Sequence, residues 1–294
     1  MNGVINIIKP PGFSSHDLVN IVRRTADMKK VGHTGTLDPM AVGVLPVCLG
    51  KATKIVDFIQ DDIKHYRCEM KFGIETNTQD VWGEVINESD IIPDIVSVEK
   101  AIKSFIGEIS QVPPMYSALK INGQKLYNLA REGKVVERKA RKKTIYSFDI
   151  VKYEEGVLLF DVRCSKGTYV RTLCHDLGKK LDSYGVMTFL ERVATGSFNL
   201  ENGVMLQDLR KHGKDFLIEN LVSIEDAISS FAKVVVGKEL LDKIKHGVRI
   251  NYVKYLKEKP LEGQMFRIYV EDVFVGIGQY NIETDKLLLT KLFI

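Results

Sequence analysis

The chain has 294 residues, of which 45% are hydrophobic and 27% are charged. This composition is typical of a soluble globular protein with one large domain, or with a large and a small one. The net charge of +4 is only mildly basic, so the placement of the cations matters more than their total. No apolar stretch is long enough to span a membrane, and the N-terminus lacks the pattern of a secretory leader.

The four cysteines are Cys48, Cys68, Cys164 and Cys174. No two of them form a Cys-x-x-Cys pair, and no histidine has a spacing that would complete a zinc site. Cys68 and Cys164 fall in apolar-looking strands, which indicates buried thiols. We therefore expect no metal, and we expect the chain in the reducing cytoplasm.

The chain begins with a predicted strand over residues 4–8, which ends before Pro10 and Pro11. Ser14 and Ser15 can cap a helix that runs from residue 16 to about residue 26. A loop follows, in which residues 32–39 read Gly-His-Thr-Gly-Thr-Leu-Asp-Pro.

Asp38 is the single carboxylate of this loop. Pro39 pushes the backbone of the preceding residue away from the helical region. The glycines at 32, 35 and 43 allow tight turns and the close approach of another molecule. An acid presented in this way can act as a nucleophile or a base, while a tight turn stabilised by the Asp38 side chain is the structural alternative.

Further along the chain, residues 66–72 and 158–164 alternate between apolar and polar side chains, as half-buried strands do. Ser97 is predicted to cap a helix that buries residues 98, 101, 102, 105 and 106. Another helix is expected from about Val170 to Leu181. Because strands and helices do not follow a regular βαβ repeat, we predict an α+β fold.

The segment from Lys120 to Lys143 is strongly basic. It contains nine Lys or Arg residues and two Glu residues, which gives this segment alone a charge of +7. Such a concentration of cations suits a polyanion such as RNA. A solvated charged loop is the alternative.

The pattern changes near Ser223, which is expected to begin a short helix. A second helix over residues 240–246 is expected to stop at Gly247. Strands are predicted over residues 264–270, 273–280 and 286–291, with turns between them. We therefore expect two domains, over residues 1–232 and 237–294.

Four blocks of this sequence, taken together and in order, resemble the TruB family of bacterial tRNA pseudouridine synthases. The resemblance covers about the first three quarters of the chain. The blocks are Gly32 to Pro39; Lys64 to Arg67 with Gly73, Thr76, Thr78, Asp80 and Gly83; Pro113 to Lys120 with Gly123, Leu126, Tyr127 and Arg131; and Cys164 to Thr172 with Asp176, Leu177 and Gly178.

The resemblance implies a mixed, mainly antiparallel sheet of the pseudouridine synthase type, flanked by helices. It also implies a mobile, RNA-clamping insertion over about residues 113–143. The C-terminal range 237–294 resembles a PUA domain, which binds RNA, in its length, its strand rhythm, His246–Gly247 and residues 274–278. A structural appendage or an oligomer contact is the alternative for this range.

The activity implied by the resemblance is the isomerisation of the T-loop uridine of tRNA, at position 55, to pseudouridine. The uridine would be flipped out of the RNA, and neither cofactor nor metal would be needed. The implied partner is the T-arm stem-loop of tRNA, bound by a monomer.

By the resemblance, Asp38 is the catalytic nucleophile. It leaves open whether Asp38 attacks the ribose, attacks the base or removes a ribose proton. Arg171 would pair with Asp38 through a bidentate contact that keeps the carboxylate ionised. Tyr66 would stack on the target base and move a proton, although its strand position alone would make it a core residue.

The implied binding residues surround the same site. His33 would help to extrude the base, and Tyr169 and Leu190 would line the uracil pocket with Tyr66. Candidates for contact with the RNA backbone are Lys54, Lys120, Arg138 and Arg141. Family members often carry two adjacent cations after the pocket leucine, whereas Leu190 is followed here by Glu191 and Arg192, which puts in doubt a phosphate contact at Glu191.

The main rival interpretation is an RNA-binding or RNA-remodelling protein that keeps the fold without catalysis. A carboxylate facing anionic RNA would weaken binding, so the presence of Asp38 with Tyr66 and Arg171 favours an enzyme. Because base extrusion itself perturbs RNA structure, we also expect the protein to assist tRNA folding.

Overall fold

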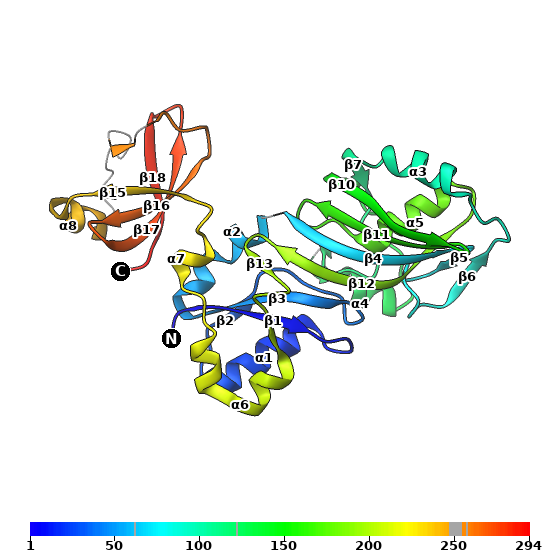
Figure 1. Cartoon of the computed structure of the whole chain (residues 1–294), viewed down its shortest axis with the longest axis horizontal. Coiled ribbons are helices and arrows are strands. Elements are labelled where there is room, and N and C mark those ends of the chain that lie inside the picture. The colour runs from blue at the N-terminus through cyan, green and yellow to red at the C-terminus, as the bar shows by residue number, and fades with distance from the viewer. Residues whose placement is uncertain (62, 122, 247–254, 257) are drawn as a thin grey trace.

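A mainly antiparallel sheet of ten strands forms the main body of the protein (Figure 1). The structure is a computed structural model that describes residues 1–294 except 62, 122, 247–254 and 257. The strand order is β14-β1-β3-β12-β4-β11-β10-β7, with β13 paired to β12 and β2 to β3. The strands are β1 (Gly3–Lys9), β2 (Val31–His33), β3 (Val42–Leu49), β4 (Lys64–Phe72), β7 (Gly107–Gln111), β10 (Arg141–Glu154), β11 (Val157–Cys164), β12 (Gly185–Thr195), β13 (Phe198–Asn199) and β14 (Val204–Met205).

Helices cover both ends of this sheet and part of its middle. Figure 1 shows α1 and α6 beside β1 and α3 near β10, while α5 packs on β12 and β4. This arrangement confirms the predicted α+β fold. The helices are α1 (Ser15–Ala26), α2 (Val56–Asp61), α3 (Ile95–Lys103), α4 (Leu126–Arg131), α5 (Val170–Lys180), α6 (Leu206–Glu219), α7 (Ile224–Ala227) and α8 (Leu241–Lys245), with 3-10 turns η1 (Gly50–Ile55) and η2 (Lys238–Leu240).

The helix starts follow their capping residues. Ser14 caps α1, and it forms a capping box with Asp17 as the sequence pattern indicates. The prediction that Ser97 caps α3 was wrong, because α3 begins three residues earlier. The Asp94 carboxylate accepts the backbone N–H of Ser97 at 2.8 Å, so the serine stands inside the first turn and the aspartate is the cap.

The alternation in β4 is confirmed. Tyr66, Cys68, Met70 and Phe72 are all buried, with Tyr66 the most exposed at 9%. All four cysteines are buried as free thiols. Since β4 lies between β12 and β11 in the middle of the sheet, Tyr66 is held by strand pairing on both sides.

The insertion has a small core of its own, formed by Met115, Leu126 and Leu129. It contains the hairpin of β8 (Lys120–Ile121) and β9 (Gln124–Lys125), followed by α4. The last three residues of the predicted range, 141–143, are already part of β10 and pair with β7. A second small hairpin, β5 (Ile74–Thr76) with β6 (Val85–Glu88), follows β4.

A separate four-stranded sheet forms the C-terminal unit, in the order β15-β16-β17-β18. The predicted strands are confirmed as β16 (Met265–Val270), β17 (Val273–Asn281) and β18 (Lys286–Leu292). The first strand, β15 (Ala232–Val236), pairs in parallel with β16. Residues 233–236, which lay between the two predicted domain ranges, therefore belong to this sheet, while the predicted helix stop at Gly247 lies outside the described residues.

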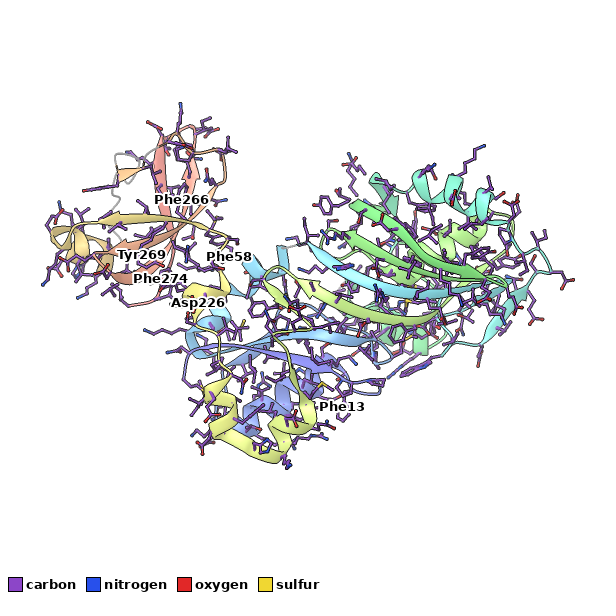
Figure 2. All side chains as sticks on the ribbon, in the orientation of Figure 1. Phe13, Phe58, Asp226, Phe266, Tyr269 and Phe274 are labelled. Carbon is purple, nitrogen blue, oxygen red and sulfur yellow. The ribbon has the colours of Figure 1, made fainter. Side chains whose placement is uncertain are left out.

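The C-terminal unit packs against the main body through apolar side chains. Ile277 and Phe293 share an apolar cluster with residues of β1, β3 and α2. Phe58 of α2 meets Phe231 edge to face, with ring centroids 5.7 Å apart. Figure 2 labels Phe58 on one side of this junction and Phe274 on the other.

Candidate active site

The loop between β2 and β3 is held at both sides of Asp38. The Ser15 hydroxyl at the start of α1 accepts the N–H of Leu37 at 2.8 Å and lies 3.1 Å from its carbonyl oxygen. On the other side, the carbonyl of Pro39 accepts the N–H of Gly12 at 2.9 Å and the Lys9 ammonium at 3.1 Å. Neighbouring elements therefore fix the backbone on which Asp38 stands.

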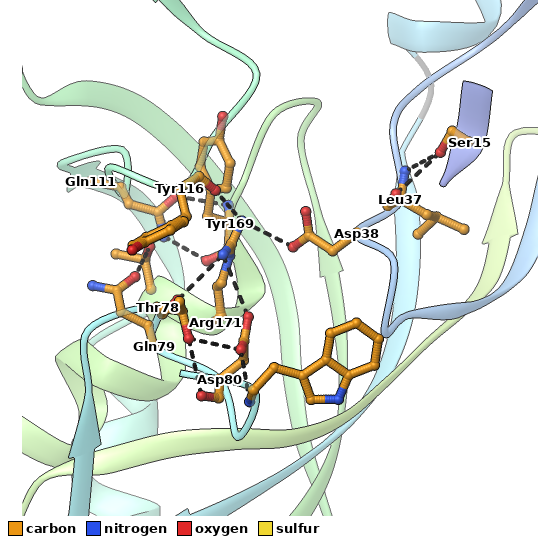
Figure 3. A network of polar contacts seen from close by, with 12 residues as sticks. Ser15, Leu37, Asp38, Thr78, Gln79, Asp80, Gln111, Tyr116, Tyr169 and Arg171 are labelled. Carbon is orange, nitrogen blue, oxygen red and sulfur yellow. Dashed lines mark hydrogen bonds and ion pairs between the residues drawn. The ribbon is translucent and has the colours of Figure 1, made fainter. Parts of the chain in front are cut away.

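Arg171 lies opposite Asp38, on the first turn of α5. Its Nη2 is 3.1 Å from Oδ2 of Asp38 and donates to the carbonyl of Tyr116 at 2.6 Å. Its Nη1 donates to the carbonyl of Thr78 at 3.2 Å and lies 3.5 Å from Oδ2 of Asp80. Figure 3 shows this guanidinium between the two carboxylates.

The expected bidentate pairing of Arg171 with Asp38 was therefore wrong in one respect. The guanidinium is shared, since Nη2 faces Asp38 and Nη1 faces Asp80. The reason is that Asp80 sits on the short loop between β5 and β6, which the fold places beside α5. Asp80 is itself held, because its Oδ1 accepts from Trp82 N at 3.1 Å and the Thr78 hydroxyl at 2.8 Å.

The ionisation of Asp38 is set by two opposing effects. Burial raises the pKa of its carboxyl above the usual 3.8, and the Arg171 guanidinium opposes this rise. The charge of Asp80 adds to the rise in pKa. The Asp38 side chain is still one third exposed, so its carboxylate remains accessible to a ligand.

Asp38 opens onto a cavity of about 540 Å³, within the range of roughly 300–1,000 Å³ that is typical of small-molecule sites. Tyr66, Tyr169, Leu190 and Arg171 all line this cavity. The structure thus brings together five of the residues that the sequence singled out. Burial raises the pKa of the Tyr66 phenol, while Arg192 beside it lowers that pKa.

Tyr169 is positioned by its backbone. Gln111 at the end of β7 accepts the N–H of Tyr169 at 2.8 Å and donates to its carbonyl at 3.0 Å. This amide clamp also fixes the start of α5, which immediately follows. The clamp therefore sets the position of Arg171, two residues further on.

His33 and Lys54 are placed away from the cavity wall. His33 ends β2, and its Nδ1 accepts the N–H of Gly35 at 3.2 Å. Lys54 lies in η1 and donates to the carbonyl of Leu292 at 2.7 Å, with its ammonium 5.6 Å from the ring centroid of Phe293. Lys54 thus contacts the C-terminal segment, which makes it a weaker candidate for RNA contact than the sequence indicated.

The other three backbone candidates lie on or next to the insertion. Arg141, the first residue of β10, lines the cavity. Lys120 is exposed on β8, next to the cavity residue Leu119. Arg138 lies between α4 and β10, and its buried Nε has no hydrogen-bond partner among the described residues.

Sequence reasoning gave no role to Lys9, which is fully buried under the Asp38 loop. Its ammonium donates to the carbonyls of Pro10 and Pro39 at 2.9 and 3.1 Å. Burial lowers the pKa of Lys9 to about 8, and Asp38 opposes this shift. The sequence feature that could have pointed to Lys9 is its position directly before two prolines, at the end of a buried strand.

Arg192 and Asp80 were also missed as site residues. Arg192 is 1% exposed, and it donates through Nε to the carbonyl of Val44 at 2.7 Å and through Nη2 to that of Gly35 at 3.2 Å. Because side chains alternate along a strand, the residue two positions after Leu190 also faces the cavity. Arg192 could therefore have been predicted as a site residue from the strand pattern. For Asp80, the signal was an acid in the Thr-x-Thr-x-Asp block.

In the part of the chain that the structure describes, no three His, Cys, Asp or Glu side chains gather as they would to hold a metal ion. None of the described helices is long and apolar enough to cross a membrane.

Comparison with known proteins gives consistent matches. Residues 23–170 match the family model of the TruB family pseudouridylate synthase N-terminal domain, and residues 171–229 match that of the tRNA pseudouridylate synthase B C-terminal domain. The chain is 47% identical to tRNA pseudouridine synthase B of Clostridium perfringens, over 98% of this chain and 99% of that one. The corresponding Clostridium tetani protein is 45% identical, with the same coverage.

A crystal structure described as a Cbf5-Nop10-Gar1 complex contains a chain with the same fold. Its TM-score is 0.77 at 26% identity, and the match covers 99% of this chain and 85% of that one. Together with the relatives above, this match supports one conclusion: the chain belongs to the TruB family of pseudouridylate synthases.

Proposed function

We propose that this protein converts uridine to pseudouridine in tRNA, and that its target is the T-loop uridine at position 55. The proposal depends mainly on one observation: the carboxylate of Asp38, paired with Arg171, opens onto a cavity that Tyr66 also lines. The names of the curated relatives, tRNA pseudouridine synthase B, support tRNA as the substrate.

The reaction breaks the bond between N1 of uracil and C1′ of the ribose and forms a new bond from C5 to C1′. The base gains a proton at N1 and loses the proton at C5, so the reaction is an isomerisation. The detached base must stay in the site while it turns. A carboxylate beside the sugar and an enclosing wall meet these needs.

In the proposed mechanism, Asp38 is the nucleophile, because a carboxylate can form a covalent intermediate at an electrophilic carbon. Arg171 keeps it oriented and favours the ionised form. Tyr66 provides a ring on which the uracil stacks, and Tyr169 and Leu190 close the pocket around the base. His33, beside the loop and next to Gly35, is proposed to fill the space that the extruded base leaves.

Extruding a uridine from folded RNA costs a few kcal/mol, and contacts with the RNA must offset this cost. Six cations line the cavity together with Asp38 as the one acid among the described lining residues. This excess of positive charge favours the RNA backbone. Because extruding a base disrupts the local RNA structure, we also propose that the protein assists tRNA folding.

The decisive experiment uses an unmodified tRNA transcript labelled with tritium at C5 of its uridines, because the proposed isomerisation releases that hydrogen. We expect the wild-type protein to release one tritium per tRNA, without added cofactor. Asp38→Asn should abolish release, with a rate loss of at least about 10³-fold, while RNA affinity stays within about threefold.

A transcript with cytidine in place of the T-loop uridine serves as the control, and it should release no tritium. Normal turnover by Asp38→Asn would exclude the nucleophile role. Tight binding and RNA refolding without any release by the wild type would favour the rival interpretation of a non-enzymatic remodelling protein.

The proposal extends to the C-terminal unit, which we propose is a PUA-like RNA-binding domain. Lys243 and Lys245 in the last turn of α8 would support contact with the RNA backbone. The monomeric state and the cytoplasmic location stay predictions.

A further inference from the structure

The single tryptophan of the chain, Trp82, lies exposed on the loop between β5 and β6. Its side chain is 60% exposed, whereas tryptophan is on average one of the more buried residues because most of its indole is apolar. Val81 and Val85 beside it are exposed as well. The hairpin therefore presents a large aromatic ring to the solvent, and the proposed chemistry gives this ring no role.

The loop that carries Trp82 is attached to the candidate active site through Asp80. Oδ1 of Asp80 accepts the backbone N–H of Trp82 at 3.1 Å. The other oxygen of the same carboxylate, Oδ2, lies 3.5 Å from Nη1 of Arg171, and Arg171 lines the cavity and pairs with Asp38. One carboxylate thus connects the backbone of Trp82 to the arginine of the cavity wall.

A second attachment joins the loop to β12. The N–H of Val81 donates to the carbonyl of Met187 at 3.0 Å, and the N–H of Met187 donates to the carbonyl of Gln79 at 3.2 Å. Met187 precedes the cavity residue Leu190 by three positions, which is about 10 Å along a strand. The described residues that line the cavity do not include Trp82, so its indole lies beside the cavity rather than in it.

The loop is closed on itself, which keeps the indole outside. The N–H of Asn77 donates to the carbonyl of Glu84 at 3.1 Å, and Oδ1 of Asn77 accepts the N–H of Glu84 at 3.1 Å. A Cβ at Gly83 would lie 2.2 Å from Oγ1 of Thr78, so the inside of the loop has no room for a larger side chain. Because the backbone on which Trp82 stands is already held, a ligand that contacts the ring has less ordering cost to offset.

An exposed ring beside this cavity suits an unpaired RNA base. Bases that leave the helical stack are commonly bound on aromatic side chains. When one uridine is extruded, the nucleotides next to it lose their stacking contact with it. Since these nucleotides lie in the same strand as the uridine in the cavity, they are brought close to Trp82, and this favours an RNA base over a partner protein as the ligand of the ring.

We propose that the indole of Trp82 stacks on the base of a nucleotide adjacent to the target uridine and so stabilises the RNA with its target base extruded. Stacking on an aromatic side chain tolerates any base, so Trp82 contributes affinity rather than a choice of sequence. This inference rests on the proposed function, because it takes RNA as the ligand of the cavity.

The first test uses the fluorescence of the protein. Because Trp82 is the only tryptophan, tryptophan emission reports on this one side chain. Binding of an unmodified T-arm stem-loop should quench the emission by about twofold or more, as a base stacks on the indole. A stem-loop with abasic nucleotides on both sides of the target uridine should bind without this quenching.

The second test compares the RNA affinity of variants. Trp82→Ala should bind the intact stem-loop about tenfold more weakly, which corresponds to the loss of one stacked base. The slope of log K against log salt should not change, because no phosphate contact is lost. Trp82→Phe should recover most of the affinity. Val85→Ala removes another exposed apolar side chain from the same hairpin and is the control, with affinity within about twofold of the wild type.

The abasic stem-loop links the two tests. Trp82→Ala should bind it as tightly as the wild type does, because the stacked base is absent. An equal loss of affinity on the intact and the abasic RNA would overturn the proposal. Unchanged emission on binding of the intact RNA would also overturn it and would leave the ring available for a partner protein.

A role of Trp82 inside the protein gives a different result. The backbone N–H that Asp80 binds persists in Trp82→Ala, so kcat at saturating RNA should stay within about threefold of the wild type. A loss of kcat with unchanged affinity would make Trp82 a support for Asp80 and would overturn stacking. Release of tritium from C5 by the wild type tests the proposed function separately: binding with quenching but without release would overturn only that function, and absence of binding would overturn both.

Discussion

At the scale of single residues, the site depends on how one arginine is divided between two acids. Arg171 is 4% exposed, so its charge is poorly hydrated and depends on the carboxylates of Asp38 and Asp80 for compensation. Asp80 is held by Thr78 and Trp82, whereas Asp38 is one third exposed. The arginine is thus anchored on the Asp80 side, and its other side orients Asp38, the proposed nucleophile.

The contact between Arg171 and Asp38 predicts how activity depends on pH. In the proposed mechanism Asp38 must be ionised, so we expect activity to be lost as the pH falls through the pKa of Asp38, which burial places above 3.8. In Arg171→Met the opposing charge is gone, and the pKa of Asp38 rises further. We expect the acid limb of single-turnover kcat/KM to move to higher pH by at least about one unit.

Arg171→Lys is the matched control, because it keeps a positive charge near Asp38. Its acid limb should move less than that of the Met variant. An acid limb that stays in place in Arg171→Met would show that Arg171 does not govern the ionisation of Asp38.

At the scale of elements, β12 fixes the loop that carries Asp38 to the sheet. In the strand register, Arg192 of β12 is paired with Tyr66 of β4 on one side and with Gly43 of β3 on the other. Gly43 has φ +100°, and a Cβ there would lie 2.3 Å from the carbonyl oxygen of Arg192. This close approach lets the guanidinium bind the carbonyls of Gly35 and Val44, one on each side of Asp38.

We therefore expect Arg192 to be a positioning residue. Arg192→Gln should lower the free energy of unfolding by about 2 kcal/mol, because it leaves buried carbonyls without donors. It should also lower kcat by more than tenfold, with RNA affinity changed much less, because the loop that carries Asp38 loses its hydrogen bonds to Arg192.

Denaturant unfolding and single-turnover kinetics check this prediction. Glu191→Gln is the control on the opposite face of β12, and it should change stability by less than about 0.5 kcal/mol. Arg192→Lys should recover part of kcat through its remaining donor. A loss of stability with unchanged kcat would make Arg192 a structural residue only.

Local sequence patterns predicted several of these elements well. The alternation of β4 and the Ser14 cap of α1 are confirmed, because each depends on side chains a few residues apart. The start of α3 was misjudged because Asp94 and Ser97 are both good caps, and only the backbone hydrogen bond decides between them. The first strand of the C-terminal sheet, β15, was missed because its pairing partner β16 is some 30 residues away.

At the scale of the whole molecule, the C-terminal unit is bound to the main body by its last residues. Phe293 is 8% exposed and stacks on Phe274, with ring centroids 5.3 Å apart. Its carbonyl accepts the Lys51 ammonium at 2.7 Å. The end of the chain therefore joins the two sheets.

Phe293→Ala should lower the free energy of unfolding by about 3 kcal/mol, as is usual for loss of a buried aromatic ring. Because the cavity lies elsewhere, kcat on a T-arm stem-loop should stay unchanged. Thermal unfolding and single-turnover kinetics test both statements. The neighbouring Ile294 is 43% exposed, so Ile294→Ala is the control and should change stability by less than about 0.5 kcal/mol.

The sequence by itself determined the α+β class, the strand and helix rhythm, the basic segment and the family resemblance that singled out Asp38, Tyr66 and Arg171. These depend on local patterns and on motifs that can be read along the chain. Only the tertiary structure decided that Arg171 is shared with Asp80, that Lys54 contacts the C-terminal strand, and that Lys9 and Arg192 hold the loop that carries Asp38. Those contacts join residues that are 30 to 238 positions apart, and such pairings depend on how the strands are ordered in the sheet, which no local pattern specifies.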